Sequence, residues 1–319
     1  MFVSIPAAIG PPATQANHPL HQQRTAEDAI VRRSLAFHHG APLAKSRSVQ
    51  FDLLLNARSG GEPFGRRRLC QAGETDYVTV GTIFEDSHIP LHKWLLAIHL
   101  LCASKKGMSA HQLHRMLGVT YKSGWFMAHR IRYAMKQEPL SSKLKGTVEA
   151  DETYVGGKVK GKGVYVGKQN KTPVVSLVQR QGEVRSFHVE QVTAKNLKPI
   201  LKEHVHGWSN LMTDDSAVYA HLGKKFATHD VVKHSASEYV RREPGKIVHT
   251  NTVEGFFSIL KRGIIGVYRH VGKQHLHRYL SEFDFRYNSR DTSDGERAIL
   301  AVKGTAGKRL TYQDSSARQ

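Results

Sequence analysis

The first sustained pattern of apolar side chains begins after Pro90, where they recur at steps of three and four residues. This spacing predicts a helix with one buried side. The apolar positions are Leu91, Trp94, Leu95, Ile98 and Leu101. Two shorter helices should follow, because Ser109 and Thr120 are suited to cap helix N-termini and Gly118 to end the first of them. Two short helices joined by a tight glycine-containing turn form a helix-turn-helix unit.

Beyond Gly146 the apolar period changes from that of helices to that of strands. Residues 147–155 alternate, residues 172–178 form the nearly continuous apolar run of a strand buried on both faces, and residues 184–189 alternate again. The later predicted elements are a helix over 193–205, a strand over 209–212, a helix over 216–226 and an amphipathic helix starting near Thr252. This order predicts an α/β fold with an open mixed sheet and flanking helices, preceded by the small helical region.

The chain carries a large excess of positive charge. Its 319 residues include 47 Lys and Arg against 27 acidic residues, a formal charge of +20. Such an excess is typical of proteins whose partner is a polyanion, although a merely basic or ribosome-associated protein has the same composition. Two cysteines, no export signal and no apolar stretch long enough to span a bilayer favour a cytoplasmic, DNA-associated protein without a membrane partner.

Two basic regions are candidates for DNA binding. The second helix of the helix-turn-helix would present Lys122, Arg130 and Arg132 to a DNA groove, unless the helix pair is a plain bundle whose aromatic side chains form its core. The glycine- and lysine-rich loop at residues 156–168 carries Lys158, Lys160 and Lys162. It lacks the ordered Walker pattern, so we interpret it as a solvated hairpin that contacts phosphates.

Three acidic residues lie on separate predicted elements. Asp151 is on the first strand, Asp214 ends the fourth strand, and Glu254 is on the late helix. Active sites gather at strand ends of such sheets. Phosphodiester cleavage is well served by two Mg²⁺ ions about 4 Å apart, and hard Mg²⁺ requires carboxylate ligands with room for water. Glu254 shares a helix face with Lys261, although an ordinary surface Glu and Lys would show the same spacing.

Several longer segments resemble the ISXO-type insertion-sequence transposases. The resembling segments are residues 148–158, Thr213-Asp214 with Tyr219, residues 249–263 and 283–288, and, upstream, residues 81–84, 90–94 and 125–132. The resemblance covers about Cys70 to Tyr312 and implies a ribonuclease-H-like catalytic domain. We therefore expect a poorly ordered or remnant segment at 1–76, a helical DNA-binding domain at 77–140, the catalytic domain at 145–312 and a tail at 313–319.

The resemblance implies a metal-dependent DDE mechanism of DNA strand cleavage and strand transfer. Asp151 and Asp214 would be the first two acids. The third position varies in the family, and both Glu254 and Asn251 lie in the matching segment; a carboxylate is the better metal ligand. The corresponding expectations are two Mg²⁺ or Mn²⁺ ions in the active site, double-stranded DNA as the partner and a homo-oligomer on DNA. We also expect Lys261 to belong to the catalytic residues by holding DNA near the metal, and Arg262 to bind DNA.

The sequence departs from the family at its N-terminus, where these transposases usually carry a zinc ribbon of paired Cys-x-x-Cys motifs. Here Cys70 is followed by Gly73 where the second cysteine of such a pair would stand. Four zinc ligands at ribbon spacing cannot be assembled, so we expect no structural zinc. The alternatives to an active transposase are a catalytically inactive DNA-binding remnant that regulates an intact relative, and a nuclease that hydrolyses DNA without strand transfer.

Overall fold

The computed structural model describes residues 69–71, 74–76, 79–137, 142–156 and 171–313. The chain divides into two compact units, residues 1–62 and 63–319. All described residues belong to the second unit. The expectation for residues 1–68 therefore lies outside the described residues. Among the helices that the structure describes, none is long and apolar enough to cross a membrane.

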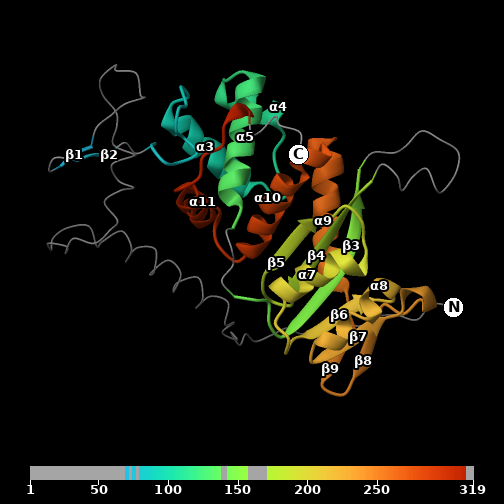
Figure 1. Cartoon of the computed structure of the whole chain (residues 1–319). Helices are drawn as coiled ribbons and strands as arrows, with labels where there is room; N and C mark the ends of the chain where they lie inside the picture. Colours follow the sequence, from blue (N-terminus) through green and yellow to red (C-terminus); the bar gives the residue numbers. More distant parts are fainter. Residues whose placement is uncertain (1–68, 72–73, 77–78, 138–141, 157–170, 314–319) are drawn as a thin grey trace, which may run out of the picture. The chain divides into compact units, whose positions relative to one another are not determined.

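A five-stranded mixed sheet forms the centre of the second unit (Figure 1). Its strands are β3 (Thr147–Val155), β4 (Thr172–Gln179), β5 (Val184–His188), β6 (Asn210–Asp214) and β7 (Thr228–Val232), in the order β5-β4-β3-β6-β7. The first three strands in sequence pair antiparallel, whereas β6 pairs parallel with both β3 and β7. β4 is buried from Pro173 to Val178, as its unbroken apolar run predicts.

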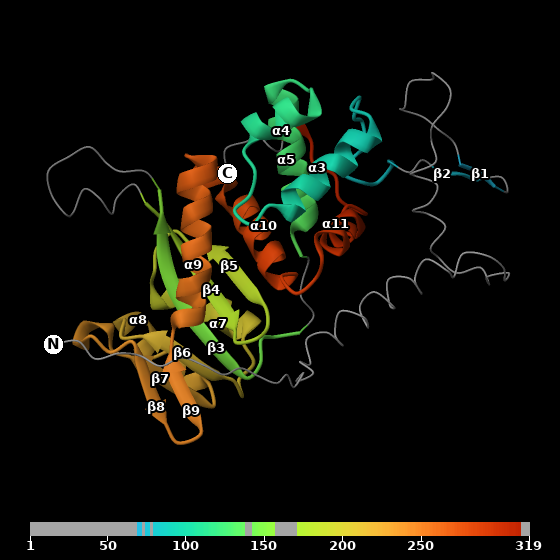
Figure 2. The same ribbon diagram turned by 180° about the vertical axis from the view of Figure 1, so that it is seen from behind.

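Helices cover both faces of this sheet, and the alternation of side chains along the strands explains why. Val148 and Ala150 of β3 point to a core shared with α7 (Ala194–His204) and α8 (Ala217–Ala220). Val155 of β3 points to the opposite core, which it shares with α9 (Asn251–Gly263) and α10 (Leu276–Asn288). Figure 2 shows α9 crossing the sheet on this second face. The sheet is therefore the middle layer of three.

A helical region packs beside the second face. It contains α3 (Leu91–Ala103), α4 (Ala110–Leu117), α5 (Tyr121–Met135) and α11 (Asp294–Lys303). Ser109 and Thr120 accept backbone hydrogen bonds as N-caps, and Gly118 ends α4 with a φ of 60°, which glycine adopts without strain. These caps confirm the predicted helix starts. Because α11 packs against α3 and α10 against α5, the region is built from both ends of the described chain.

The sequence predicted the elements from α3 to β6 in the correct order, and it predicted the start of α9 near Thr252 correctly, but it erred between β6 and α9. The helix expected over 216–226 is only the short α8 followed by a 3-10 turn, η1 (Gly223–Lys225). A Cβ at Gly223 would lie 2.0 Å from the ring of His229, so the absence of a side chain at this position lets β7 approach closely. β7 and the hairpin β8 (Val240–Glu243) and β9 (Lys246–His249) were not predicted.

The remaining elements are short. They are β1 (Leu69–Gln71), β2 (Glu74–Asp76), η2 (His234–Ala236), the π-helical turn η3 (Ile264–Tyr268) and η4 (Lys273–His275).

Candidate functional site

Asp151 and Asp214 occupy equivalent positions on neighbouring parallel strands. The register pairs Glu149 of β3 with Met212 of β6. Two residues further along each strand, Asp151 and Asp214 point to the same face as this pair, because side chains alternate with a period of two. That face is the one covered by α9. The two aspartates that the sequence singled out are therefore brought to the same face of adjacent strands, Asp214 at the end of β6 and Asp151 in the middle of β3.

The Asp151 carboxyl lies in an environment that disfavours its charge. Burial first, and then the nearby carboxylates of Asp214, Glu152 and Glu254, raise its pKa from 3.8 to about 7. The only opposing contact of note is a hydrogen bond from the backbone N–H of Glu152 to Asp151 Oδ1, 2.7 Å long. Burial also raises the pKa of Asp214, although the backbone N–H of Ser216 donates to its Oδ1 at 3.2 Å.

Glu254 reaches the same site from α9. Its Oε1 accepts from Thr250 Oγ1 at 3.0 Å and lies 3.5 Å from His234 Nε2. The carboxylate is half-exposed and acts electrostatically on Asp151. Asn251, the rival for the third position, is exposed at the first residue of α9, where its backbone N–H donates to His249 Nδ1 at 3.2 Å. The structure thus brings Glu254 into the acidic group.

The acids adjacent in sequence to the two aspartates have other partners. Glu152 accepts a hydrogen bond of 2.9 Å from the hydroxyl of Tyr219, on the α8 side of the sheet. Burial raises its pKa and Asp214 adds to that shift, so Glu152 remains within electrostatic reach. Asp215 is exposed and accepts from the backbone N–H of Ser235 at 3.3 Å. Glu152 therefore points to the α8 side of the sheet, away from α9, and Asp215 is bound to the segment around Ser235.

The donor set fits a hard divalent cation. Three carboxylates come from three different elements, two of them have pKa values raised by burial, and a cation between them would remove their mutual repulsion. The half-exposed Glu254 leaves room for water ligands. In the described part of the chain, no three His, Cys, Asp or Glu side chains are already arranged as a metal site.

Lys261 and Arg262 lie in the last turn of α9, two turns beyond Glu254. Both side chains are exposed, and Arg262 Nη2 donates to Ser258 Oγ on the same helix. They present positive charge on the helix that carries Glu254. Lys158, Lys160 and Lys162 lie outside the described residues.

The helix-turn-helix does not present its arginines as the sequence suggested. Arg130 is 5% exposed and donates to the backbone oxygens of Ile83 and Glu85 at 2.7 and 2.9 Å. Arg132 is 2% exposed, and its Nε donates to Glu282 at 2.6 Å. Most of α5 is core, because it packs against both α4 and α10. Of the three predicted groove-reading cations, Lys122 alone is exposed.

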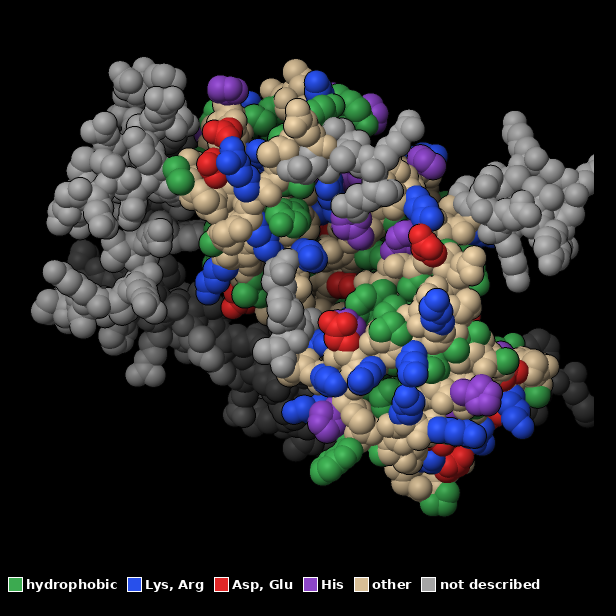
Figure 3. Space-filling view, viewed as in Figure 1, with side chains coloured by type: hydrophobic (Ala, Val, Ile, Leu, Met, Phe, Trp, Pro, Cys, Tyr) green, Lys and Arg blue, Asp and Glu red, His purple; other side chains and the backbone are tan. Residues whose placement is uncertain are grey.

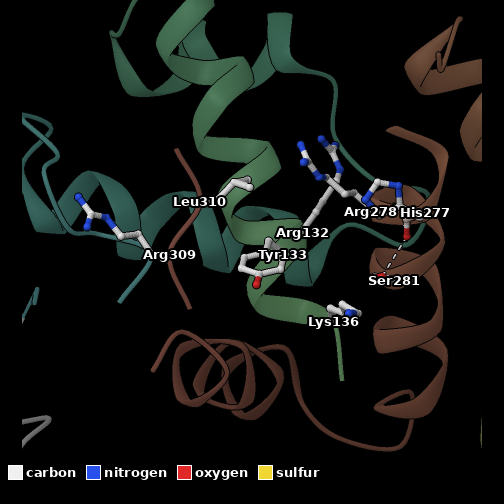
Figure 4. Close-up of a pocket in the computed structure, with 8 residues that line it drawn as sticks. All are labelled: Arg132, Tyr133, Lys136, His277, Arg278, Ser281, Arg309 and Leu310. Atoms are coloured by element: carbon white, nitrogen blue, oxygen red, sulfur yellow. Dashed lines mark hydrogen bonds between the residues drawn. The ribbon is translucent and has the colours of Figure 1, made fainter. Parts of the chain in front are cut away.

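Arg132 instead borders a basic cavity of about 420 Å³ between α5 and α10 (Figure 4). Lys136, Arg278 and Arg309 also line it. Burial and the neighbouring charge of Arg278 lower the pKa of His277 in its wall to about 4. On the face that carries α7, Lys and Arg side chains predominate over acidic ones (Figure 3). Positive charge is thus spread over both the helical region and the sheet.

Sequence reasoning missed two groups of site residues. His234 and Thr250 contact Glu254, but they lie around β8 and β9, a part of the chain where no element was predicted. Glu149 is fully buried beneath the start of α9. The sequence did contain a signal for Glu149. This residue stands between apolar neighbours and lies on the same strand face as Asp151, where an ordinary surface acid would not be expected.

Comparisons with known proteins match the chain to a transposase domain and to a protein of a transposable element. Residues 143–288 match the model of the ISXO2-like transposase domain, which spans all three acids of the site. A protein of Halobacterium salinarum, described as an uncharacterized protein in transposable element ISH50, is 29% identical over 268 residues, covering 78% of this chain and 87% of the relative.

Solved structures give weaker similarity. A Mos1 transposase paired-end complex with left transposon end is 11% identical, with 90% of each chain covered and a TM-score of 0.29. A pre-cleavage Mos1 transpososome is 13% identical, with 92% of this chain and 96% of that chain covered and a TM-score of 0.23. Structural similarity this low supports no conclusion about the chemistry of the site.

Proposed function

Because this chain carries an ISXO2-like transposase domain over residues 143–288, we propose that it cleaves and joins DNA strands as the transposase of an insertion sequence. In this proposal Asp151, Asp214 and Glu254 hold two Mg²⁺ or Mn²⁺ ions. The sheet would be ribonuclease-H-like, as the resemblance implies, and the antiparallel β3–β5 followed by two parallel strands supports this.

One observation carries the proposal: three acids far apart in the sequence share one electrostatic environment. Burial and like charges raise the pKa of Asp151 to about 7. Neighbouring carboxylates with raised pKa values are typical of functional sites, because their mutual repulsion does not stabilise the fold. Bound divalent ions would polarise the phosphodiester and stabilise the attacking and leaving oxygens.

The chain's own residues would orient these ligands and hold the DNA. Thr250 and His234 restrict the Glu254 carboxylate through their contacts at 3.0 and 3.5 Å. Backbone N–H groups of Glu152 and Ser216 each bind one oxygen of an aspartate, so the other oxygen of each carboxylate remains for an ion. Lys261 and Arg262 would contact phosphates beside the site, as would the exposed Lys122 further away.

Double-stranded DNA is the proposed partner, both as element ends and as target. The net charge of +20 supports this, since Lys and Arg release counterions from phosphates. A homo-oligomer on DNA and a DNA-associated, cytoplasmic location of bacterial type belong to the same proposal.

A strand-transfer assay tests the function. The full chain would be incubated with Mg²⁺, a supercoiled plasmid and a labelled duplex whose end carries the inverted repeat that flanks the gene. We expect the label to become covalently joined to the plasmid. Nicking without joining would indicate a hydrolytic nuclease, and binding without either product would indicate an inactive DNA-binding protein. Both outcomes would contradict the proposal.

A further inference from the structure

We propose that Glu149 is the positioning residue that fixes α9, and with it Glu254, against the strand that carries Asp151. The inference rests on the proposed function for its consequence, because the acid it positions is the third metal ligand. The positioning itself is a property of this chain's own contacts.

Glu149 binds the N-terminus of α9 through three hydrogen bonds. Its Oε2 accepts from the backbone N–H groups of Thr252 and Val253 at 2.8 and 3.0 Å, and its Oε1 accepts from Thr252 Oγ1 at 2.8 Å. The carboxylate is completely buried. A helix N-terminus has backbone N–H groups without helical partners and attracts negative charge. Glu149 therefore acts as an N-terminal anchor supplied by a different element.

Arg180 completes the anchor from the end of β4. Its Nε donates to Glu149 Oε1 at 2.6 Å, and its Nη1 and Nη2 donate to the backbone oxygens of Ile247 and His249 at 2.7 and 2.9 Å. One ion pair thus binds both the end of β9 and the start of α9. These hydrogen bonds and the ion pair offset the free-energy cost of burying the Glu149 carboxylate. An isolated buried charge would have no such compensation.

The position of Glu149 makes this anchor specific to the site. It lies two residues before Asp151 on the same face of β3, and its partner Val253 immediately precedes Glu254. The apolar packing of α9 through Val253 and Phe257 is non-directional and would tolerate small sliding or rotation. Hydrogen bonds to the first turn are directional and would not tolerate such movement. Glu149 therefore sets the position of α9 along its axis and its rotation, and with them the placement of Glu254 relative to Asp151.

A partly buried carboxylate in the same domain provides a matched control. Asp284 of α10 accepts from the backbone N–H and Oγ of Ser186 at 2.8 and 2.7 Å and so joins α10 to β5. It is an anchor between a helix and a strand, as Glu149 is, but its partner is on the edge strand β5. Glu149→Gln and Asp284→Asn therefore remove comparable anchors, of which only the first adjoins the acids.

The test compares these two variants of the full chain by hydrogen exchange and by Mn²⁺ binding. We expect Glu149→Gln to speed amide exchange in the first turn of α9 and to weaken Mn²⁺ binding by about tenfold or more. Asp284→Asn should leave both properties near those of the wild type, even if it loses as much thermal stability as Glu149→Gln does. Thr252→Val, which removes one of the three bonds, should shift both in the same direction by less, and it serves if Glu149→Gln does not fold.

The outcomes separate the inference from the proposed function. Unchanged exchange in α9 in Glu149→Gln, or equal weakening of Mn²⁺ binding by Asp284→Asn, would overturn the positioning role. A wild-type protein that binds no Mn²⁺ would instead overturn the proposed metal site. In that case the exchange measurement still decides whether Glu149 positions α9.

Discussion

Arg132 Nε donates to Glu282 Oε2 at 2.6 Å, in an ion pair where the two side chains are 2% and 0% exposed. Glu282 also accepts from Arg286 and from the hydroxyl of Tyr268. These contacts hold the pKa of Glu282 down to about 2, although burial alone would raise it. The pair joins α5 to α10 at the centre of the helical region. Arg132 is therefore an internal structural residue.

Replacing Arg132 should destabilise the fold. Arg132→Ala leaves Glu282 with fewer partners in a buried site, and we expect a loss of about 3–5 kcal/mol in the free energy of unfolding. Urea denaturation followed by circular dichroism measures this loss. A change below about 1 kcal/mol would contradict the structural role, since such small losses are typical of exposed ion pairs.

The exposed Lys122 gives the contrasting prediction for DNA affinity. Lys122→Gln should leave stability nearly unchanged and should reduce the slope of log affinity against log salt by about one phosphate contact. Fluorescence anisotropy with a labelled duplex at several salt concentrations measures the slope. An unchanged slope would leave the helix pair with a packing role alone.

Some features of the helical region could be predicted from the sequence, and others could not. The caps Ser109 and Thr120 act locally, so they predicted the helix starts correctly. The side of α5 that faces the core depends on α10 and α11, which lie far away in sequence, and therefore Arg130 and Arg132 could not be distinguished from surface cations. Their burial follows from backbone acceptors at Ile83 and Glu85 and from Glu282.

The third acidic position can be assigned by direct comparison of two variants. Glu254 acts on Asp151 and contacts Thr250 and His234, whereas Asn251 is exposed at the helix start. We expect Glu254→Gln to lower Mg²⁺-dependent cleavage by about a hundredfold or more, since it removes a charge that holds the metal. Asn251→Ala should change the cleavage rate by much less, and the reverse order would transfer the role to Asn251.

Stability of the metal-free protein should depend on the charge of Asp151. Its pKa is about 7 in the fold and 3.8 ordinarily, so between these values the folded state binds more protons than the unfolded state. This group therefore lowers stability as pH rises from about 4 to about 7. Asp151→Asn should stabilise the metal-free protein by about 1–2 kcal/mol at neutral to alkaline pH, after allowance for relaxation and solvent.

The pH dependence provides the check on that prediction. Thermal unfolding in a chelator should show the advantage of Asp151→Asn shrink below about pH 7 and vanish by about pH 3, where the wild-type carboxyl is protonated in both states. Added Mg²⁺ should stabilise the wild type and have little effect on the variant. A variant less stable than the wild type at neutral pH would contradict the mutual repulsion of the acids.

The purified protein should contain no stoichiometric zinc. A closed structural site requires four ligands, and Cys70 stands near Gly73 where a second cysteine would be needed. Cys70→Ser should then leave the unfolding temperature nearly unchanged. Elemental analysis that finds about one zinc per chain would contradict this and would indicate ligands elsewhere in the N-terminal segment.

The three acids of the candidate site could be predicted from the sequence, whereas the residues that surround them could not. Asp151 lies within a strand, Asp214 ends one, and Glu254 lies on a helix face, and local patterns reveal all three placements. The side chains that orient them come through contacts at long sequence separation, as with Glu149 and Thr252, which are 103 residues apart. Only the pairing of β3 with β6 and the crossing of α9 bring such residues together.

The most direct test of the proposed active site is Mg²⁺-dependent cleavage of duplex DNA by three single variants. Asp151→Asn and Asp214→Asn should each abolish cleavage while leaving duplex affinity unchanged, because each removes one proposed metal ligand. Asp215→Asn is the matched control, since this exposed neighbour binds Ser235 and should cleave as the wild type does. Cleavage retained in both Asp151→Asn and Asp214→Asn would contradict the assignment of these acids.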